Sequence, residues 1–361
     1  MRNLTTTVML AILAFITAGC HLLDIDLFSG PEDLGSGKGT ANCYVITKPG
    51  TFKFKAVKGN SQENLSAVTA EVLWETWNNA EDVTPNSVIA STALQNGYVV
   101  FSTPEVLKPG NAVIAARDAG GVIVWSWHIW VPASDISVDN HGVYGVAMMD
   151  RNLGALVPAT TDGPAPVESF GLTYQWGRKD PFVGPQRANS GNNATVAGTA
   201  ISVAQTQGPG DARISLANSI QRPTLIGYSQ NGDWVLLGDP TFWRDDEKTI
   251  YDPCPPGYRV PACDKTQYLH GEDLSVAPGW TINLEQYWFA LGKPLAVFPF
   301  AGYRDDYSPE GLTHTYDRSL LWTTTSSTDE KAYCVNVRGG YTQVLGEAPK
   351  ARAGSVRCVS E

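Results

Sequence analysis

Residues 251–263 (YDPCPPGYRVPAC) constrain the fold more than any other stretch of the chain. They hold four prolines and one glycine within thirteen positions, and such a composition excludes a regular helix or a central strand. Cys254, Cys263 and Arg259 therefore lie in a segment that has little freedom to bend. The stretch predicts a stiff strap that joins distant parts of a domain, and we interpret it as architecture rather than as an active site.

The length and composition of the chain indicate a secreted, β-rich protein. Its 361 residues suffice for two domains with separate cores. Only 17% of the residues are charged, whereas glycine, proline, tryptophan and tyrosine are abundant, a balance typical of β-rich, loop-rich extracytoplasmic proteins. A nucleic-acid partner would require a basic patch, and the net charge of −10 gives it no support, so no such partner is expected.

The N-terminus predicts export and lipid attachment. Residues 1–20 combine one basic residue, a short apolar run over residues 8–16 and small residues directly before Cys20, which is the pattern of a secretory signal. The run is too short to span a membrane. Its end resembles a bacterial lipobox, although Thr17 stands where leucine is usual. We expect lipidation of Cys20 and firm anchoring through its acyl chains; an ordinary cleaved signal is the alternative.

The next segments predict a tether followed by a β-sandwich. Residues 21–40 are rich in glycine and serine, which is typical of a flexible linker. Over residues 41–132, six or seven short alternating runs are separated by Gly, Pro and Asn turns. This pattern predicts an antiparallel sandwich of immunoglobulin-like type.

The last run of this predicted sandwich is aromatic on both faces. Alternation places Trp125 and Trp127 on one face of the strand and His128 and Trp130 on the other. We expect one face to lie in the core. A binding platform on the other face is the alternative.

A series of motifs runs through residues 144–361 and is similar to a known family. In chain order the motifs are MDRNLG (149–154), GLTYQWGRKDPF (171–182), DPCPPGYRVP (252–261), FPFAGYR (298–304), LWTTT (321–325) and SVRCV (355–359). This series resembles the Fibrobacter succinogenes major paralogous domain, which is common in lipoproteins of Bacteroidetes. The resemblance implies a C-type-lectin-like α+β fold, distantly similar to formylglycine-generating enzymes, and a surface or fimbria-associated binding role without established catalytic activity.

The residues of this second domain suggest local structure as well. Leu172 and Trp176 are i,i+4 neighbours and predict a short helix that ends at Gly177. A second helix is expected over residues 262–269, after a proline. Residues 191–211 are rich in small and polar residues and predict a long surface loop. Four later apolar runs, beginning at residues 295, 319, 332 and 355, are expected to form a sheet.

Five cysteines remain after Cys20, and the resemblance suggests how they pair. It places the strap beside the final strand, which implies a disulfide between Cys254 and Cys358. Cys263 and Cys334 are a possible second pair. Cys43 would then stay unpaired, buried in the sandwich as a small apolar residue.

Metal, cofactor and enzyme chemistry find little support. The cysteines and histidines lack zinc-site spacing, and the sugar-binding triplets of calcium-dependent lectins are missing, so we expect no metal and no cofactor. A formylglycine-generating type of oxidase is the least favoured interpretation, because its copper-binding cysteine pair is missing. No Gly-x-Ser-x-Gly motif is present. We therefore expect the protein not to be an enzyme.

Candidate binding residues are drawn from the long-loop region, since loops carry the sites of lectin-like folds. They are Trp234, Trp243, Tyr303 and Asp305. Four arginines inside the motifs are expected instead to be buried donors to loop carbonyls: Arg151, Arg178, Arg259 and Arg304.

Together these features predict a lipid-anchored binding or adhesion protein of the cell envelope. It would present a lectin-like domain to a glycan or protein ligand, from the outer membrane and on the cell surface, with a periplasmic orientation left open. The alternative is a structural, tip or accessory subunit of a fimbria, whose partners would be other fimbrial subunits.

Overall fold

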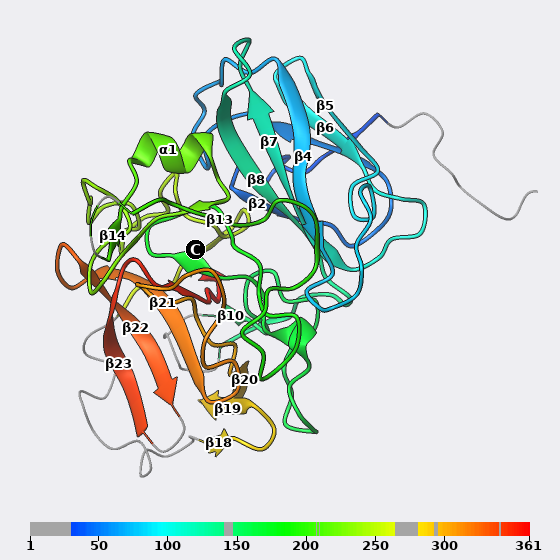
Figure 1. Cartoon of the computed structure of the whole chain (residues 1–361). Helices are drawn as coiled ribbons and strands as arrows, with labels where there is room; N and C mark the ends of the chain where they lie inside the picture. Colours follow the sequence, from blue (N-terminus) through cyan, green and yellow to red (C-terminus); the bar gives the residue numbers. More distant parts are fainter. Residues whose placement is uncertain are drawn as a thin grey trace, which may run out of the picture.

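The computed structural model describes residues 30–140, 147–206, 208, 210–263, 281–291, 295–338 and 341–361. The described chain is mainly β, as the sequence predicts, with a single α-helix of six residues, α1 (Leu216–Gln221), and a 3₁₀ turn, η1 (Val167–Ser169). Figure 1 shows the strands of the first half in blue and cyan above and the orange and red strands β21–β23 below. None of the helices in these residues is long and apolar enough to cross a membrane.

The strands of the first half form two facing sheets, and one of these sheets gains β12 from the second half. One has the order β1 (Glu32–Asp33), β3 (Thr51–Lys55), β6 (Tyr98–Ser102), β5 (Ser91–Gln95), and the other has β12 (Val196–Gly198), β4 (Thr69–Thr76), β7 (Gly110–Arg117), β8 (Ile123–Val131), β2 (Cys43–Val45). Their inner faces share one apolar core, in which Phe54 of the first sheet packs against Trp127 of the second and against Phe101 of its own sheet. The β5–β6 hairpin turns at Asn96 and Gly97, both with positive φ, as a two-residue Asn-Gly turn requires.

Residues 30–40 correct the prediction of a tether over 21–40. Glu32 and Asp33 form β1, which pairs in parallel with β3, and the turn that follows begins with the Gly35 amide donating to the Asp33 carboxylate over 3.0 Å. This segment is therefore part of the first sheet. Residues 21–29 lie outside the described chain.

The outer face of the second sheet is also buried. The alternation in β8 is as predicted: Trp125 and Trp127 enter the sandwich core, while Trp130 lies on the opposite side. The second half of the chain covers that opposite side, so Trp130 is fully buried there. His128 is buried as well, and this burial lowers its pKa to about 3. Both faces are core, and neither offers an aromatic platform to solvent. Cys43 forms no disulfide and is buried, as predicted. It lies on this outer face of the second sheet and not in the core between the two sheets.

Backbone contacts join the two halves as well. β12, from the second half, pairs with β4 and extends the second sheet. The indole N–H of Trp130 donates to the Ala155 carbonyl over 3.0 Å, and Asn78 and Asn111 both donate to the Gly154 carbonyl over 2.8 Å. The predicted boundary between residues 132 and 144 thus separates two stretches of sequence that share a continuous core.

The second half consists of short strands around one long meander. The meander is β21 (Arg318–Ser326), β22 (Lys331–Arg338) and β23 (Tyr341–Pro349), and a second three-stranded sheet is β18 (Thr281–Asn283), β19 (Trp288–Leu291) and β20 (Ala296–Pro299). The remaining short strands are β9 (Val138–Asp139), β10 (Met148–Met149), β11 (Tyr174–Gln175), β13 (Ser202–Val203), β14 (Asp211–Ala212), β15 (Leu225–Ile226), β16 (Tyr228–Ser229), β17 (Tyr258–Arg259), β24 (Ala353–Gly354) and β25 (Val359–Ser360). Three of the four predicted late strands are β20, β21 and β22, and the fourth run ends in β25. They do not form one sheet as predicted: β21 and β22 share a sheet, whereas β20 and β25 each belong to another.

The helix predicted around Leu172 and Trp176 is wrong. The segment is extended, and its strand β11 pairs with β24. Gly171 and Gly177 have positive φ and turn the chain at each end. Residues four apart also share a face of a strand, so the spacing that suggested a helix fits the extended segment equally well. The helix predicted over 262–269 falls on residues 264–269, outside the described chain, and the predicted loop at 191–211 contains β12 and β13.

The strap prediction is confirmed. β17, inside the strap, pairs with the final strand β25, and Cys254 and Cys358 form a disulfide with a Cα–Cα distance of 5.9 Å. The second predicted disulfide is wrong, because Cys263 and Cys334 are not joined. Cys334 packs with Trp322 on one face of the β21–β22 sheet, whereas Cys263 packs with Val335 on the other.

Candidate binding site

Trp234 and Trp243 lie in the core rather than at a surface. Each side chain is about 1% exposed. The Trp234 indole donates to the Trp176 carbonyl over 2.8 Å, and the Trp243 indole donates to the Tyr251 carbonyl over 2.9 Å. Because both rings are enclosed and both N–H groups are satisfied, these tryptophans hold loops together and present no face to a ligand.

Tyr303 and Asp305 lie together around Arg352. The guanidinium of Arg352 stacks 5.1 Å from the centre of the Tyr303 ring, and its Nε donates to Asp305 over 3.2 Å and to Asp306 over 2.8 Å. Burial raises the pKa of Asp305. These contacts pair the positive charge of Arg352 with the carboxylates of Asp305 and Asp306. The neighbouring Tyr307 is the well exposed ring of this cluster, at 57%.

Three of the four candidate arginines, Arg151, Arg178 and Arg304, are buried donors to loop carbonyls as predicted, whereas Arg259 is not buried. Arg178 donates to the carbonyls of Pro223 and Leu225 over 2.7 and 2.8 Å. Arg304 donates to the carbonyls of residues 309 and 310 over 3.2 Å. Burial lowers the pKa of Arg178 to about 10 and that of Arg304 to about 9, so both remain charged at neutral pH. Arg259, which is only half-buried, donates to a loop carbonyl, that of residue 245.

A different part of the molecule offers an open site. A cleft of about 470 Å³ lies where the two halves and the strap meet, and we name it the junction cleft. Its lining comes from residues 32–38 and 44–47 of the first half, from residues 135–136 of the connector with Met149, and from residues 255–258 of the strap. Junctions between structural units are common positions for ligand sites, and this volume lies within the usual range for small-molecule pockets.

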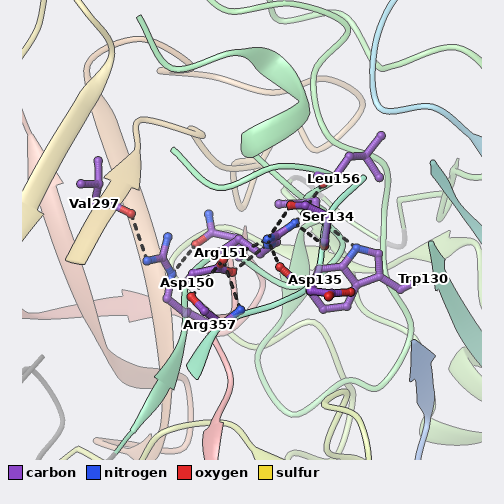
Figure 2. Close-up of polar contacts among 11 residues, drawn as sticks. Trp130, Ser134, Asp135, Asp150, Arg151, Leu156, Val297 and Arg357 are labelled. Atoms are coloured by element: carbon purple, nitrogen blue, oxygen red, sulfur yellow. Dashed lines mark hydrogen bonds and ion pairs between the residues drawn. The ribbon is translucent and has the colours of Figure 1, made fainter. Parts of the chain in front are cut away.

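Arg151 fixes the connector wall of the cleft. Its side chain is about 1% exposed and donates to the carbonyls of Ser134, Asp135 and Leu156 over 3.2, 2.8 and 3.0 Å, as Figure 2 shows. Its Nε and Nη2 also reach both carboxylate oxygens of Asp150, over 2.7 and 2.9 Å. A bidentate pair of this kind fixes orientation as well as position, so the segment carrying Asp135 is held against the core.

Lys248 and the disulfide fix the strap wall. The ammonium group of Lys248, whose side chain is 5% exposed, donates to the carbonyls of Cys254, Pro255 and Tyr258 and lies 3.4 Å from the Glu361 carboxylate. The disulfide ties the same segment to the last strand. Prolines, a buried ammonium and a cross-link therefore restrain one short wall.

The cleft combines apolar surfaces with polar groups. Met149 and Tyr44 are lining residues, and both are almost fully buried. The Tyr44 ring stacks on Phe54 with 4.4 Å between ring centres, and burial raises its pKa so that the hydroxyl stays neutral. Asp33 and Asp135, which carry carboxylates, line the cleft as well.

No group of three or more His, Cys, Asp or Glu side chains that could hold a metal ion occurs in the part of the chain that the structure describes. Sequence reasoning missed the junction cleft because it assigned residues 32–38 to a tether and found no pattern in the connector. Only the strap, with Tyr258 among its prolines, signalled this region. Comparison with family models, curated proteins and solved structures finds no match to this chain.

Proposed function

We propose that this protein is a lipid-anchored binding or adhesion protein of the cell envelope, which holds a glycan or protein ligand in the junction cleft. In this proposal, residues 1–20 direct export, Cys20 carries the lipid, and the body faces outward from the outer membrane. The first half would be an immunoglobulin-like sandwich and the second a C-type-lectin-like domain, as the motif resemblance implies. The protein would bind its ligand without transforming it.

The observation that carries the proposal is the way the cleft is built. Its walls come from four separate stretches of the chain, and buried contacts restrain two of them, through Arg151 and through Lys248. A site whose walls are fixed before binding loses little conformational entropy when the ligand arrives. The shared core behind the cleft keeps the two halves in one arrangement, which favours a binding function for a body displayed at a surface.

Two experiments test the proposal. Metabolic labelling with a fatty acid should mark the native chain and leave a Cys20→Ala variant unlabelled, and protease shaving of intact cells should remove the body if it faces outward. An unlabelled native chain would contradict the anchor. A chain that resists shaving until the outer membrane is opened would place it in the periplasm.

The binding test uses the full chain with Cys20→Ser, applied to a glycan array and to a panel of envelope and matrix proteins. Ser36→Trp places a large ring in the cleft and should abolish binding. Val106→Trp is the matched control, because residue 106 lies outside the cleft and its native side chain is 83% exposed. Binding that survives Ser36→Trp would refute the cleft as the site. Absence of binding to both panels, with the native protein found only in assembled filaments, would favour a fimbrial subunit.

A further inference from the structure

The walls of the junction cleft present flat apolar surfaces beside hydrogen-bonding groups. Pro255, Pro256 and the half-buried Tyr258 line the strap side, and Ile136 lines the connector side. Proline rings and tyrosine faces pack well against rigid, ring-shaped ligands. A rigid ring is also compatible with walls that the disulfide and the Lys248 contacts hold in place.

The polar groups of the cleft are acceptors above all. The carboxylate of Asp135 has no hydrogen bond or ion pair among the interactions of the described residues, and only its backbone carbonyl is used, by Arg151. Asp33 uses one oxygen for the Gly35 amide. Ser36 and Thr47 add hydroxyl groups that can donate or accept. Free carboxylate oxygens are strong acceptors for the hydroxyl groups of a ligand.

The charge balance of the cleft disfavours an anionic ligand. Glu32 forms an ion pair with Lys48, with 2.8 Å between the charged atoms. This leaves the carboxylates of Asp33 and Asp135 facing a single cation, Lys38. An acidic sugar or a phosphate group would therefore meet net negative charge, whereas an uncharged ligand with many hydroxyl groups would not.

The size of the cleft favours a small ligand over the surface of a folded protein. A folded protein partner needs about 800 Å² of contact on each side and would have to touch much surface outside the cleft, whereas a cleft of about 470 Å³ matches the usual size of a small-molecule pocket. We therefore propose that the junction cleft binds a neutral carbohydrate unit, the terminal one or two rings of a glycan, with the sugar's apolar face on the strap and its hydroxyl groups on Asp33 and Asp135. This inference rests on the proposed function and specifies its ligand.

The test measures affinity by calorimetry for neutral oligosaccharides and for oligosaccharides that contain uronic acid, with the full chain carrying Cys20→Ser. Asp135→Asn keeps the shape of the side chain but removes its charge. It should weaken binding of the neutral sugar about 10- to 100-fold, which is the typical loss for a hydrogen bond to a charged group. Asp82→Asn, the same change at an exposed aspartate outside the cleft, should leave the affinity unchanged.

A second variant addresses the packing surface. Tyr258→Ala should weaken neutral-sugar binding, while Tyr307→Ala, at an exposed tyrosine outside the cleft, should not. Native thermal unfolding of each variant shows that it is folded, and Tyr258→Phe, which keeps the ring, should restore most of the affinity lost in Tyr258→Ala.

Three results would overturn the inference. They are stronger binding of the acidic sugars than of the neutral ones, sugar binding that neither Asp135→Asn nor Ser36→Trp reduces, and no sugar binding at all. If no sugar binds but a protein ligand binds and is displaced by Ser36→Trp, the carbohydrate assignment fails while the proposed binding function stands. If nothing binds, both fail.

Discussion

Replacing Trp130 with alanine tests whether the two halves fold as one unit. The side chain is fully buried on the outer face of the second sheet, where it packs into a core shared with residues of the second half. Truncation of a buried tryptophan costs about 3–5 kcal/mol. The Ala155 carbonyl also loses its indole donor, which adds about 1 kcal/mol when the acceptor stays buried.

Amide hydrogen exchange measures the loss of stability caused by Trp130→Ala in both halves at once. Because each 1.4 kcal/mol is a factor of ten in an equilibrium constant, a combined loss of about 4–6 kcal/mol should speed the slowest amides roughly 700- to 20,000-fold. The prediction is that amides of β7 in the first half and of β21 in the second accelerate together. Val106→Ala, at an 83% exposed position, should change neither. If β7 accelerates while β21 keeps its native rate, the halves are independent and the shared-core reasoning fails.

Three further changes follow from the described contacts. Replacing both Cys254 and Cys358 with serine should cost about 4–5 kcal/mol in urea unfolding, because the bond closes a loop with a sequence separation of 104 residues; a native thiol at Cys358 in peptide mapping would contradict the bond. Burial raises the pKa of Asp233 to about 6, so the folded chain holds this proton more tightly than the unfolded chain. The contribution of Asp233 to stability should therefore fall by about 3 kcal/mol as the pH rises from about 3 to about 7. Urea unfolding of Asp233→Asn should lack this component; an unchanged pH profile would contradict the assignment. Arg151→Met leaves the half-buried carboxylate of Asp150 and several carbonyls without their donor, which should cost about 2–4 kcal/mol. Amide exchange over residues 133–136 should become faster; unchanged exchange there would show that Arg151 does not hold the connector.

The sequence allowed the strap and the strands to be predicted because their signals are local. Prolines exclude regular structure wherever they occur, and alternation in β8 predicts two faces regardless of what covers them. The disulfide between Cys254 and Cys358 was accessible through the motif resemblance. The same local reasoning failed at Leu172 and Trp176, where one spacing fits both a helix and a strand.

The junction cleft could not be predicted, because it depends on contacts between distant segments. β1 is two residues long and forms only because β3 lies beside it. The segment itself has no strand pattern, and its nearby glycines made it resemble a linker. The pairing of β12 with β4 joins residues more than a hundred positions apart, and no local pattern encodes it. Likewise, Trp234 and Trp243 resembled binding residues until their indole donors were seen to be satisfied inside the core.

Oxidative footprinting on intact cells tests the central claim and does not require the ligand to be identified first. Hydroxyl radicals label accessible tyrosine and methionine side chains, and the labelling of protein on cells can be compared with that of purified protein. The account predicts that Tyr258 in the junction cleft is protected on cells, while Tyr307, which is 57% exposed outside it, is labelled equally in both samples. Equal labelling of Tyr258 in the two samples, with Tyr307 protected instead, would contradict the assignment of the junction cleft as the binding site.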